Sequence, residues 1–473
     1  MTGWPELVSV ALLGTERREP PPLDDPGLGG LAAGDAEERL LTAAGAIAVQ
    51  RRAGRRPAKA PALPPPAPEE TLSPCPPAAA NRLSLLLEDR RVLLAEWLRA
   101  LAARGARSPE ERLPDLLEAA TATQALRADV ETVLGQRGRW LASLEPRWAW
   151  AAPLPQDEEE RESAWATGDR PHRRRLFAHL RREAPDRARQ LLEAGWNEEP
   201  PEDRAWFVAA LADGLSAEDE PLLERALDDR RREVRAAAAD LLPRLPESAF
   251  GGRMRGRTLP LVRVEGGLRK RLHVMLPEDL DEATARDGIM RKPPQAMGER
   301  AWWLVQLVGS TPLGAWDELG LSPDQATKLR ANDDLETPLR AGFARAADQQ
   351  RNPCWAEAFV EVEPRLAELL DPESAASFAV ARLRAGAVDV AEQLPAPWPR
   401  AASAEGLELL VQLLRPGGDW ARARLLALRI DPTLADDAAK RLGGLDPASG
   451  IAQLADETLS LLTFRHDMHE ELR

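Results

Sequence analysis

Residues 215–246, LSAEDEPLLERALDDRRREVRAAAADLLPRLP, constrain the fold more than any other stretch of the sequence. They read as two short helices placed back to back. The apolar residues of the second recur at i, i+3, i+4, i+7 and i+8, the spacing of one helix face: Val234, Ala237, Ala238, Leu241 and Leu242. Such a pair cannot bury its apolar face alone and must stack on similar pairs. The stretch therefore predicts an all-α array of stacked helical hairpins, an α-solenoid.

Composition agrees with a helical chain and limits its partners. The chain has 473 residues, more than one ordinary core accommodates, with no Tyr and few other strand-forming aromatic residues. Its net charge of −14 argues against a dedicated nucleic-acid binder, because release of counterions requires a broad basic face. Two cysteines, Cys75 and Cys354, exclude a disulfide framework or a cysteine-based zinc site within the chain.

The start of the sequence, MTGWPELVSV, has neither a basic region nor the apolar core of a signal peptide. No run of about 18 apolar residues follows anywhere in the sequence. We therefore expect a soluble, cytoplasmic protein.

Changes in composition predict four regions. An N-terminal helical domain spans 1–152 and contains a proline-rich segment at 57–77, which is either a connector or a docking peptide for an aromatic groove. Helical repeats follow at 164–250, a hairpin insertion with a link at 251–295, and C-terminal helical repeats at 296–473. In the last region, helix starts recur as a capping residue followed by proline: Ser322-Pro323, Asp371-Pro372, Asp431-Pro432 and Asp446-Pro447.

The segment from Gly251 to Pro277 interrupts the helical pattern. Apolar residues alternate on both sides of a Gly-Gly pair, which predicts a β-hairpin whose apolar positions are Val262, Val264, Leu272 and Val274. Seven basic residues accompany a single acidic one, and we predict that they bind a partner: Arg253, Arg255, Arg257, Arg263, Arg269, Lys270 and Arg271. The one strongly basic segment of an acidic protein thus coincides with its predicted β element.

Known catalytic motifs are almost absent from the sequence. The sequence contains no GxxxxGK[ST] phosphate loop and no GxSxG nucleophile motif. His466 and His469 are three residues apart and could contact one ion together with Asp467 or Glu470. Two histidines without a clear third ligand are, however, typical of a solvated helix end. We expect no catalytic residues, no cofactor and no metal site.

The stretch from which we started resembles the HEAT repeat, a helical hairpin that stacks into solenoids. Val234 and Leu241 occupy the expected apolar positions, and Asp229 and Arg235 the positions of the charged pair. In that family the Asp and the Arg bridge neighbouring repeats, and the arrays act as scaffolds for protein partners. The resemblance implies a HEAT-like α-solenoid in which these four residues mediate repeat stacking.

Other segments resemble a broader, uncharacterised bacterial family of HEAT-like proteins. They are ALLGTERR at 11–18, GQRGRWLA at 135–142, LPESAFGGRMRGR at 245–257 and ARDGI at 285–289. Members of that family are encoded near MoxR-type AAA ATPases, von Willebrand A-domain proteins and SWIM zinc-finger proteins. The resemblance implies an accessory role in an ATPase-centred complex, with a MoxR-type ATPase or a von Willebrand A-domain protein as partner.

Together these observations predict a non-catalytic scaffold or adaptor for protein–protein interactions. The alternative is a HEAT-like nucleic-acid-binding protein that uses basic patches around residues 173–182 and 253–271. Within 201–250, however, 7 basic residues face 12 acidic ones, so local pairing would offset much of the positive charge.

Overall fold

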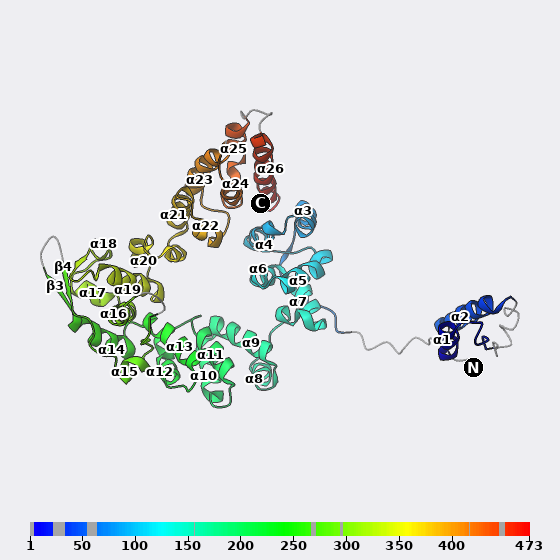
Figure 1. Ribbon diagram of the computed structural model, residues 1–473, viewed down its shortest axis with the longest axis horizontal. Helices are drawn as coiled ribbons and strands as arrows, with labels where there is room; N and C mark the ends of the chain where they lie inside the picture. Colours follow the sequence, from blue (N-terminus) through cyan, green and yellow to red (C-terminus); the bar gives the residue numbers. More distant parts are fainter. Residues whose placement is uncertain are drawn as a thin grey trace. The chain divides into compact units, whose positions relative to one another are not determined.

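The computed structural model describes residues 4–21, 34–53, 64–155, 157–265, 271–293, 297–415, 417–443 and 450–473. Contacts divide the chain into two compact units, Met1–Pro66 and Ala67–Arg473. Over the described residues the chain is mostly helical, as the sequence predicts (Figure 1). It also contains two small sheets.

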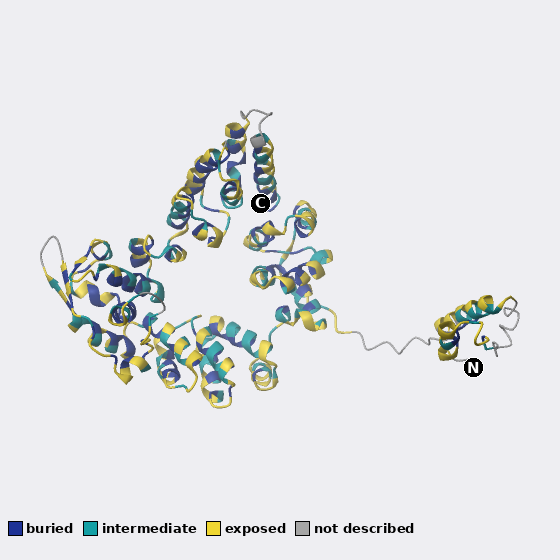
Figure 2. Ribbon diagram, in the orientation of Figure 1, coloured by how far each residue is buried: buried dark blue, intermediate teal, exposed yellow. Residues whose placement is uncertain are grey.

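The first unit is a helical hairpin of α1 (Trp4–Leu13) and α2 (Ala36–Ala53). Asp35 caps the second helix, because its carboxylate accepts a hydrogen bond of 2.8 Å from the backbone N–H of Glu38. The shared core is small and consists of Leu7, Ala43 and Ile47 with Leu40 and Ala44 packed against it. Large apolar residues therefore remain exposed on both helices, and Figure 2 colours much of this unit as exposed.

The second unit begins with a helical cluster built around the buried Trp97. A short parallel pair of strands, β1 (Ser73–Pro74) and β2 (Ala106–Arg107), ties its first segment to the loop after its second helix. The helices of the cluster are α3 (Pro77–Glu88), α4 (Leu94–Ala103), α5 (Leu113–Ala122), α6 (Arg127–Val133) and α7 (Gly135–Leu144).

Successive short helices follow and pack on a second core. Its centre is aromatic, with the ring centroids of Phe177 and Phe207 4.9 Å apart and Trp165 beside both. The helices are α8 (Glu158–Thr167), α9 (Arg170–Glu183), α10 (Pro185–Gly195), α11 (Pro201–Ala210), α12 (Glu220–Leu227), α13 (Arg232–Leu241) and α14 (Ala249–Thr258). The two helices predicted within 215–246 are α12 and α13, and Val234, Ala238, Leu241 and Leu242 are buried as their spacing predicts.

The predicted hairpin is present as β3 (Val262–Glu265) and β4 (Arg271–Val274). The strands are antiparallel, with Val262 opposite Val274 and Val264 opposite Leu272. A third strand, β5 (Arg330–Ala331), which we did not predict, pairs in parallel with β4. Burial of Val262, Leu272 and Val274 in the large C-terminal core explains the alternating pattern.

The remaining helices follow, and all except the first contribute to that core, which extends along the chain from Val262 to Leu462. They are α15 (Glu282–Arg286), α16 (Glu299–Ser310), α17 (Gly314–Glu318), α18 (Pro323–Thr327), α19 (Glu336–Gln349), α20 (Pro353–Phe359), α21 (Pro372–Arg384), α22 (Asp389–Gln393), α23 (Arg400–Leu413), α24 (Trp420–Ala427), α25 (Ala435–Leu442) and α26 (Gly450–Glu470). Three of the predicted capped starts are confirmed, at Ser322, Asp371 and Asp431. The fourth, at Asp446, lies outside the described residues.

Candidate functional site

The seven basic residues assigned to the hairpin are not all on it. Arg253, Arg255 and Arg257 belong to α14, so their placement on a β element was wrong. The glycine-rich segment GGRMRGR forms a helix because Ser248 caps it, accepting from the N–H of Gly251 at 3.1 Å, and because its apolar residues are buried. Of the others, Arg263 and Arg271 are exposed on β3 and β4, whereas Arg269 and Lys270 lie outside the described residues.

The arginines of α14 are engaged with acidic residues of the same chain. Arg253 donates to both carboxylate oxygens of Asp287, at 2.8 and 2.9 Å, and to Glu224 at 2.8 Å. Arg257 donates to Asp287 at 2.6 Å, and Arg255 pairs with Glu318. Burial alone would raise the pKa of Asp287, but hydrogen bonds from Arg253 and Arg257 outweigh it and lower that pKa.

Arg286 extends this network toward α12. It donates to both carboxylate oxygens of Asp228, at 2.7 and 2.8 Å, and to Glu224 at 3.0 Å. We call the whole group the Asp287 cluster: Glu224, Asp228, Arg253, Arg257, Arg286 and Asp287. Because three arginines face three carboxylates, the cluster is balanced in charge and ties together α12, α14 and α15.

The residues assigned to repeat stacking also lie at contacts between helices. Arg204 of α11 donates to the carboxylate of Asp229 at 3.0 Å, and Arg235 of α13 donates to the backbone carbonyl of Asp229 at 2.7 Å. Val234 and Leu241 are buried in the same core. The turn at Asp229 thus connects α11 with α13.

The second predicted basic patch, residues 173–182, is largely paired as well. Arg173 binds Glu199, and Arg174 binds Asp203 at 2.8 Å. Arg181 is fully buried and donates to both carboxylate oxygens of Asp219 at 2.9 and 3.1 Å. Much of the positive charge in this patch is therefore used within the fold.

A contact that the sequence did not predict joins the two ends of the second unit. Arg465 of α26 is fully buried and donates to both carboxylate oxygens of Glu96 on α4, at 2.8 and 2.9 Å. It also donates to the carbonyls of Ala427 and Ile430 at 2.8 and 2.7 Å. His469 lies 2.8 Å from Glu96, so this histidine has a structural partner inside the protein. We call this contact the seam.

Around the seam, α26 packs directly on the first helices of the second unit. Met468 and Leu472 are buried in the core built around Trp97. The guanidinium groups of Arg82 and Arg90 both lie over the ring of Phe464, each 4.5 Å from its centroid. The sequence does contain a pattern that indicates burial of Arg465. This charged residue lies on the same helix face as the apolar residues Leu461, Leu462 and Met468.

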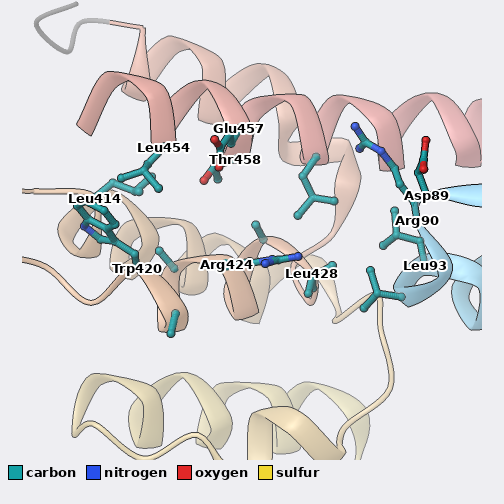
Figure 3. Close-up of a pocket in the computed structure, with 15 residues that line it drawn as sticks. Asp89, Arg90, Leu93, Leu414, Trp420, Arg424, Leu428, Leu454, Glu457 and Thr458 are labelled. Atoms are coloured by element: carbon teal, nitrogen blue, oxygen red, sulfur yellow. The ribbon is translucent and has the colours of Figure 1, made fainter. Parts of the chain in front are cut away.

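Beside the seam lies a cleft of about 550 Å³, which we call the seam cleft (Figure 3). Its walls come from the loop after α3, from α24 and from α26. The larger apolar side chains that line it are Val92, Leu93, Leu414, Trp420, Leu428, Leu454 and Leu461, and the charged ones are Asp89, Arg90, Arg424 and Glu457. In Figure 3, Leu414, Trp420 and Leu454 lie together at one end of the cleft, and Asp89, Arg90 and Leu93 at the other.

The local sequence explains why an aromatic side chain lies open in this cleft. Asp419 caps α24 by accepting from the N–H of Arg422 at 3.1 Å, which makes Trp420 the first residue of the helix. Its side chain is 45% exposed, although the neighbouring Ala423 and Leu414 are buried. The charged lining is balanced, with two arginines and two carboxylates. Such a cleft can receive apolar side chains and hold polar groups at its margin.

From residues 6 to 472 the chain matches a family described as DUF5691, a family of unknown function. The chain belongs to this family. Comparisons with curated proteins and with solved structures found no match. The matched residues lie in both structural units and cover the Asp287 cluster and the seam of this chain.

Other features of this family member bear on its chemistry. The thiol of Cys75 is half-buried, and burial raises its pKa to about 11, against a smaller lowering by Arg104, which opposes a role as a nucleophile. Within the described ranges, no three His, Cys, Asp or Glu side chains are grouped so that they could hold a metal ion. Helices long and apolar enough to cross a membrane are likewise absent from the part of the chain that the structure describes.

Proposed function

We propose that this chain is a non-catalytic protein–protein interaction scaffold whose helices follow a HEAT-like solenoid arrangement. The observation that carries the proposal is the seam cleft. In it the half-exposed Trp420 is surrounded by apolar residues and by equal numbers of arginines and carboxylates. Tryptophan and arginine are the residue types most often found at the energetic centre of protein interfaces. The ligand that fits this cleft is a segment of a partner protein with apolar anchor residues.

The bridges between successive helices support the HEAT-like part of the proposal. Arg174 of α9 pairs with Asp203 of α11, and Arg204 of α11 pairs with Asp229 before α13. In HEAT arrays, charged pairs of this kind connect neighbouring repeats, as the sequence resemblance implies. The same pairs support a structural role for these arginines, because each already has a carboxylate partner.

A direct test uses the exposed tryptophan. Trp420→Glu puts a charge into the seam cleft, and Leu144→Glu makes a similar change at a position that is also exposed, at 46%, but lies outside it. Each protein is used as bait in a lysate of the native host, followed by mass spectrometry. The proposal predicts a protein partner that the wild type and Leu144→Glu retain and Trp420→Glu loses. MoxR-type AAA ATPases and von Willebrand A-domain proteins are the first candidates for direct binding measurements.

Recovery of a nucleic acid in place of a protein would overturn this proposal and favour the alternative function. The alternative predicts DNA binding with a steep salt dependence that is lost when Arg269, Lys270 and Arg271 are replaced by Glu. A gel shift at low salt without any bound DNA would eliminate the alternative. It has less support, since most arginines of the two predicted patches pair within the fold.

A further inference from the structure

A second cavity, which we call the arginine pocket, lies next to the Asp287 cluster and has a volume of about 280 Å³. Its walls come from α13, from the loop Asp287–Met290 and from the facing ends of α16 and α19. The segment ARDGI at 285–289 lines it in full. The pocket is thus separate from the seam cleft, and the proposed scaffold function does not use it.

The loop that forms one wall is held in place by specific contacts. Gly288 has a φ of +90°, and a Cβ on it would lie 2.5 Å from the Cβ of Ala239, so glycine is required there. The buried Gln306 holds the end of this loop in place. Its side-chain amide accepts a hydrogen bond from the N–H of Met290 at 2.8 Å and donates one to the carbonyl of Met290 at 2.9 Å. These contacts make the pocket a preformed cavity.

Four arginines and two carboxylates line the pocket: Arg232, Arg235, Arg286, Arg345, Asp240 and Asp287. Two of these groups are already neutralised, since Asp287 is bound by Arg253 and Arg257, and Arg286 is bound by Asp228. Arg232, Arg235 and Arg345 remain. Across the ranges that the structure describes, none of these three has a carboxylate oxygen within 4.0 Å of its side-chain nitrogens.

The one other carboxylate that acts on Arg345 is already paired with an arginine. Asp348, the nearest other carboxylate to Arg345 along α19, is bound by Arg365 at 3.2 Å. Burial lowers the pKa of Arg345, and Asp240 is the strongest influence that opposes this shift. Arg232, Arg235 and Arg345 therefore contribute three positive charges to the lining against the single free carboxylate of Asp240, an excess of two, although Arg235 also donates to the carbonyl of Asp229.

We propose that the arginine pocket binds a small phosphate monoester. A monoester carries about −1.5 to −2 charges at neutral pH, which matches the excess of two positive charges in the pocket. Guanidinium groups suit phosphate because they donate two parallel hydrogen bonds. The pocket volume, about 280 Å³, lies just below the range for pockets of drug-sized ligands, about 300–1,000 Å³, so the pocket accommodates a phosphate with a few attached atoms.

The proposal is tested by calorimetric titration of the full chain with inorganic phosphate in a chloride buffer of low ionic strength. Saturable binding at one site is expected, weakened at least tenfold in Arg345→Gln and in Arg232→Gln. Arg232 is exposed, so its variant still reports on the pocket if Arg345→Gln does not fold. Asp240→Asn removes the opposing charge and should tighten binding several-fold. The matched control is Arg340→Gln, an arginine on α19 that does not line the pocket.

Two results would overturn the proposal. Absence of saturable phosphate binding overturns the proposal, and so does an equal loss of affinity in Arg340→Gln and Arg232→Gln, which would mean attraction by net charge alone. Titration with glycerol 3-phosphate and with a phosphoserine peptide then distinguishes the source of the monoester. Tighter binding of glycerol 3-phosphate identifies a free small molecule, and tighter binding of the peptide a phosphorylated side chain.

Discussion

The seam gives the most direct test of how the second unit is held together. In Glu96→Gln the buried guanidinium of Arg465 keeps its bonds to the carbonyls of Ala427 and Ile430 but loses its carboxylate partner. Removing one partner of a buried ion pair costs about 3–5 kcal/mol, since a charge is left uncompensated. The glutamine oxygen can still accept a hydrogen bond, so we expect the lower end, about 3 kcal/mol.

Hydrogen exchange of the amides in α26 measures this loss. Since about 1.4 kcal/mol corresponds to a tenfold change in an equilibrium constant, protection should fall by about two orders of magnitude. Arg99→Gln provides a control on the same helix, α4, because Arg99 pairs with Asp129 near the surface, with 46% and 21% of the two side chains exposed. Exposed pairs of this kind contribute about 0.2–1 kcal/mol.

The two variants should therefore differ by about tenfold or more in the exchange of α26. Equal protection of α26 in Glu96→Gln and Arg99→Gln would refute the view that the seam holds the ends together. A double variant, Glu96→Leu with Arg465→Met, distinguishes the effect of an uncompensated buried charge from the effect of losing the contact itself. Because it removes both charges, it should cost less than Glu96→Gln if the uncompensated charge is the main cause of the lost stability.

Three further predictions concern single side chains. The folded pKa of Glu96 is lowered, so the stability that this carboxylate contributes is present above its unfolded pKa and is lost as pH falls through the folded pKa. The difference in unfolding midpoint between the wild type and Glu96→Gln should therefore narrow below about pH 4. Iodoacetamide at pH 8 should modify the exposed Cys354 before Cys75, as followed by mass spectrometry, and the reverse order would contradict the raised pKa of Cys75. Gly288→Ala should cost about 1–3 kcal/mol in a thermal melt. Gly252→Ala, inside α14 with open space around it, should instead raise stability by about 0.5–1 kcal/mol.

Local patterns allowed several elements to be predicted from the sequence. The apolar spacing of α13 and the alternation around Val262 and Leu272 identify a helix face and a strand face, because both periods are fixed by backbone geometry. The same reasoning was wrong for Arg253, which we assigned to the basic hairpin segment and which lies on α14. There the Ser248 cap and buried apolar residues outweigh the low helix propensity of glycine.

Contacts between distant parts of the chain were beyond such reasoning. Glu96 and Arg465 are 369 residues apart, and no local pattern indicates which of many acidic residues an arginine will meet. The two-residue strand β5 is too short to have a period. The seam cleft depends on both limits, since its walls come from the loop after α3 and from α24 and α26.

The position of the cleft beside the seam has a consequence for partner binding. In an open array of helices the terminal members need polar outer faces, but here Met468 and Leu472 of the C-terminal end are buried against the first helices of the second unit. Glu96 does not line the cleft, yet it holds one wall to the other. Glu96→Gln should therefore weaken a partner bound in the cleft as well as the protection of α26. Trp420→Glu should abolish binding and leave that protection unchanged, so loss of both properties in both variants would mean that the cleft and the seam cannot be separated.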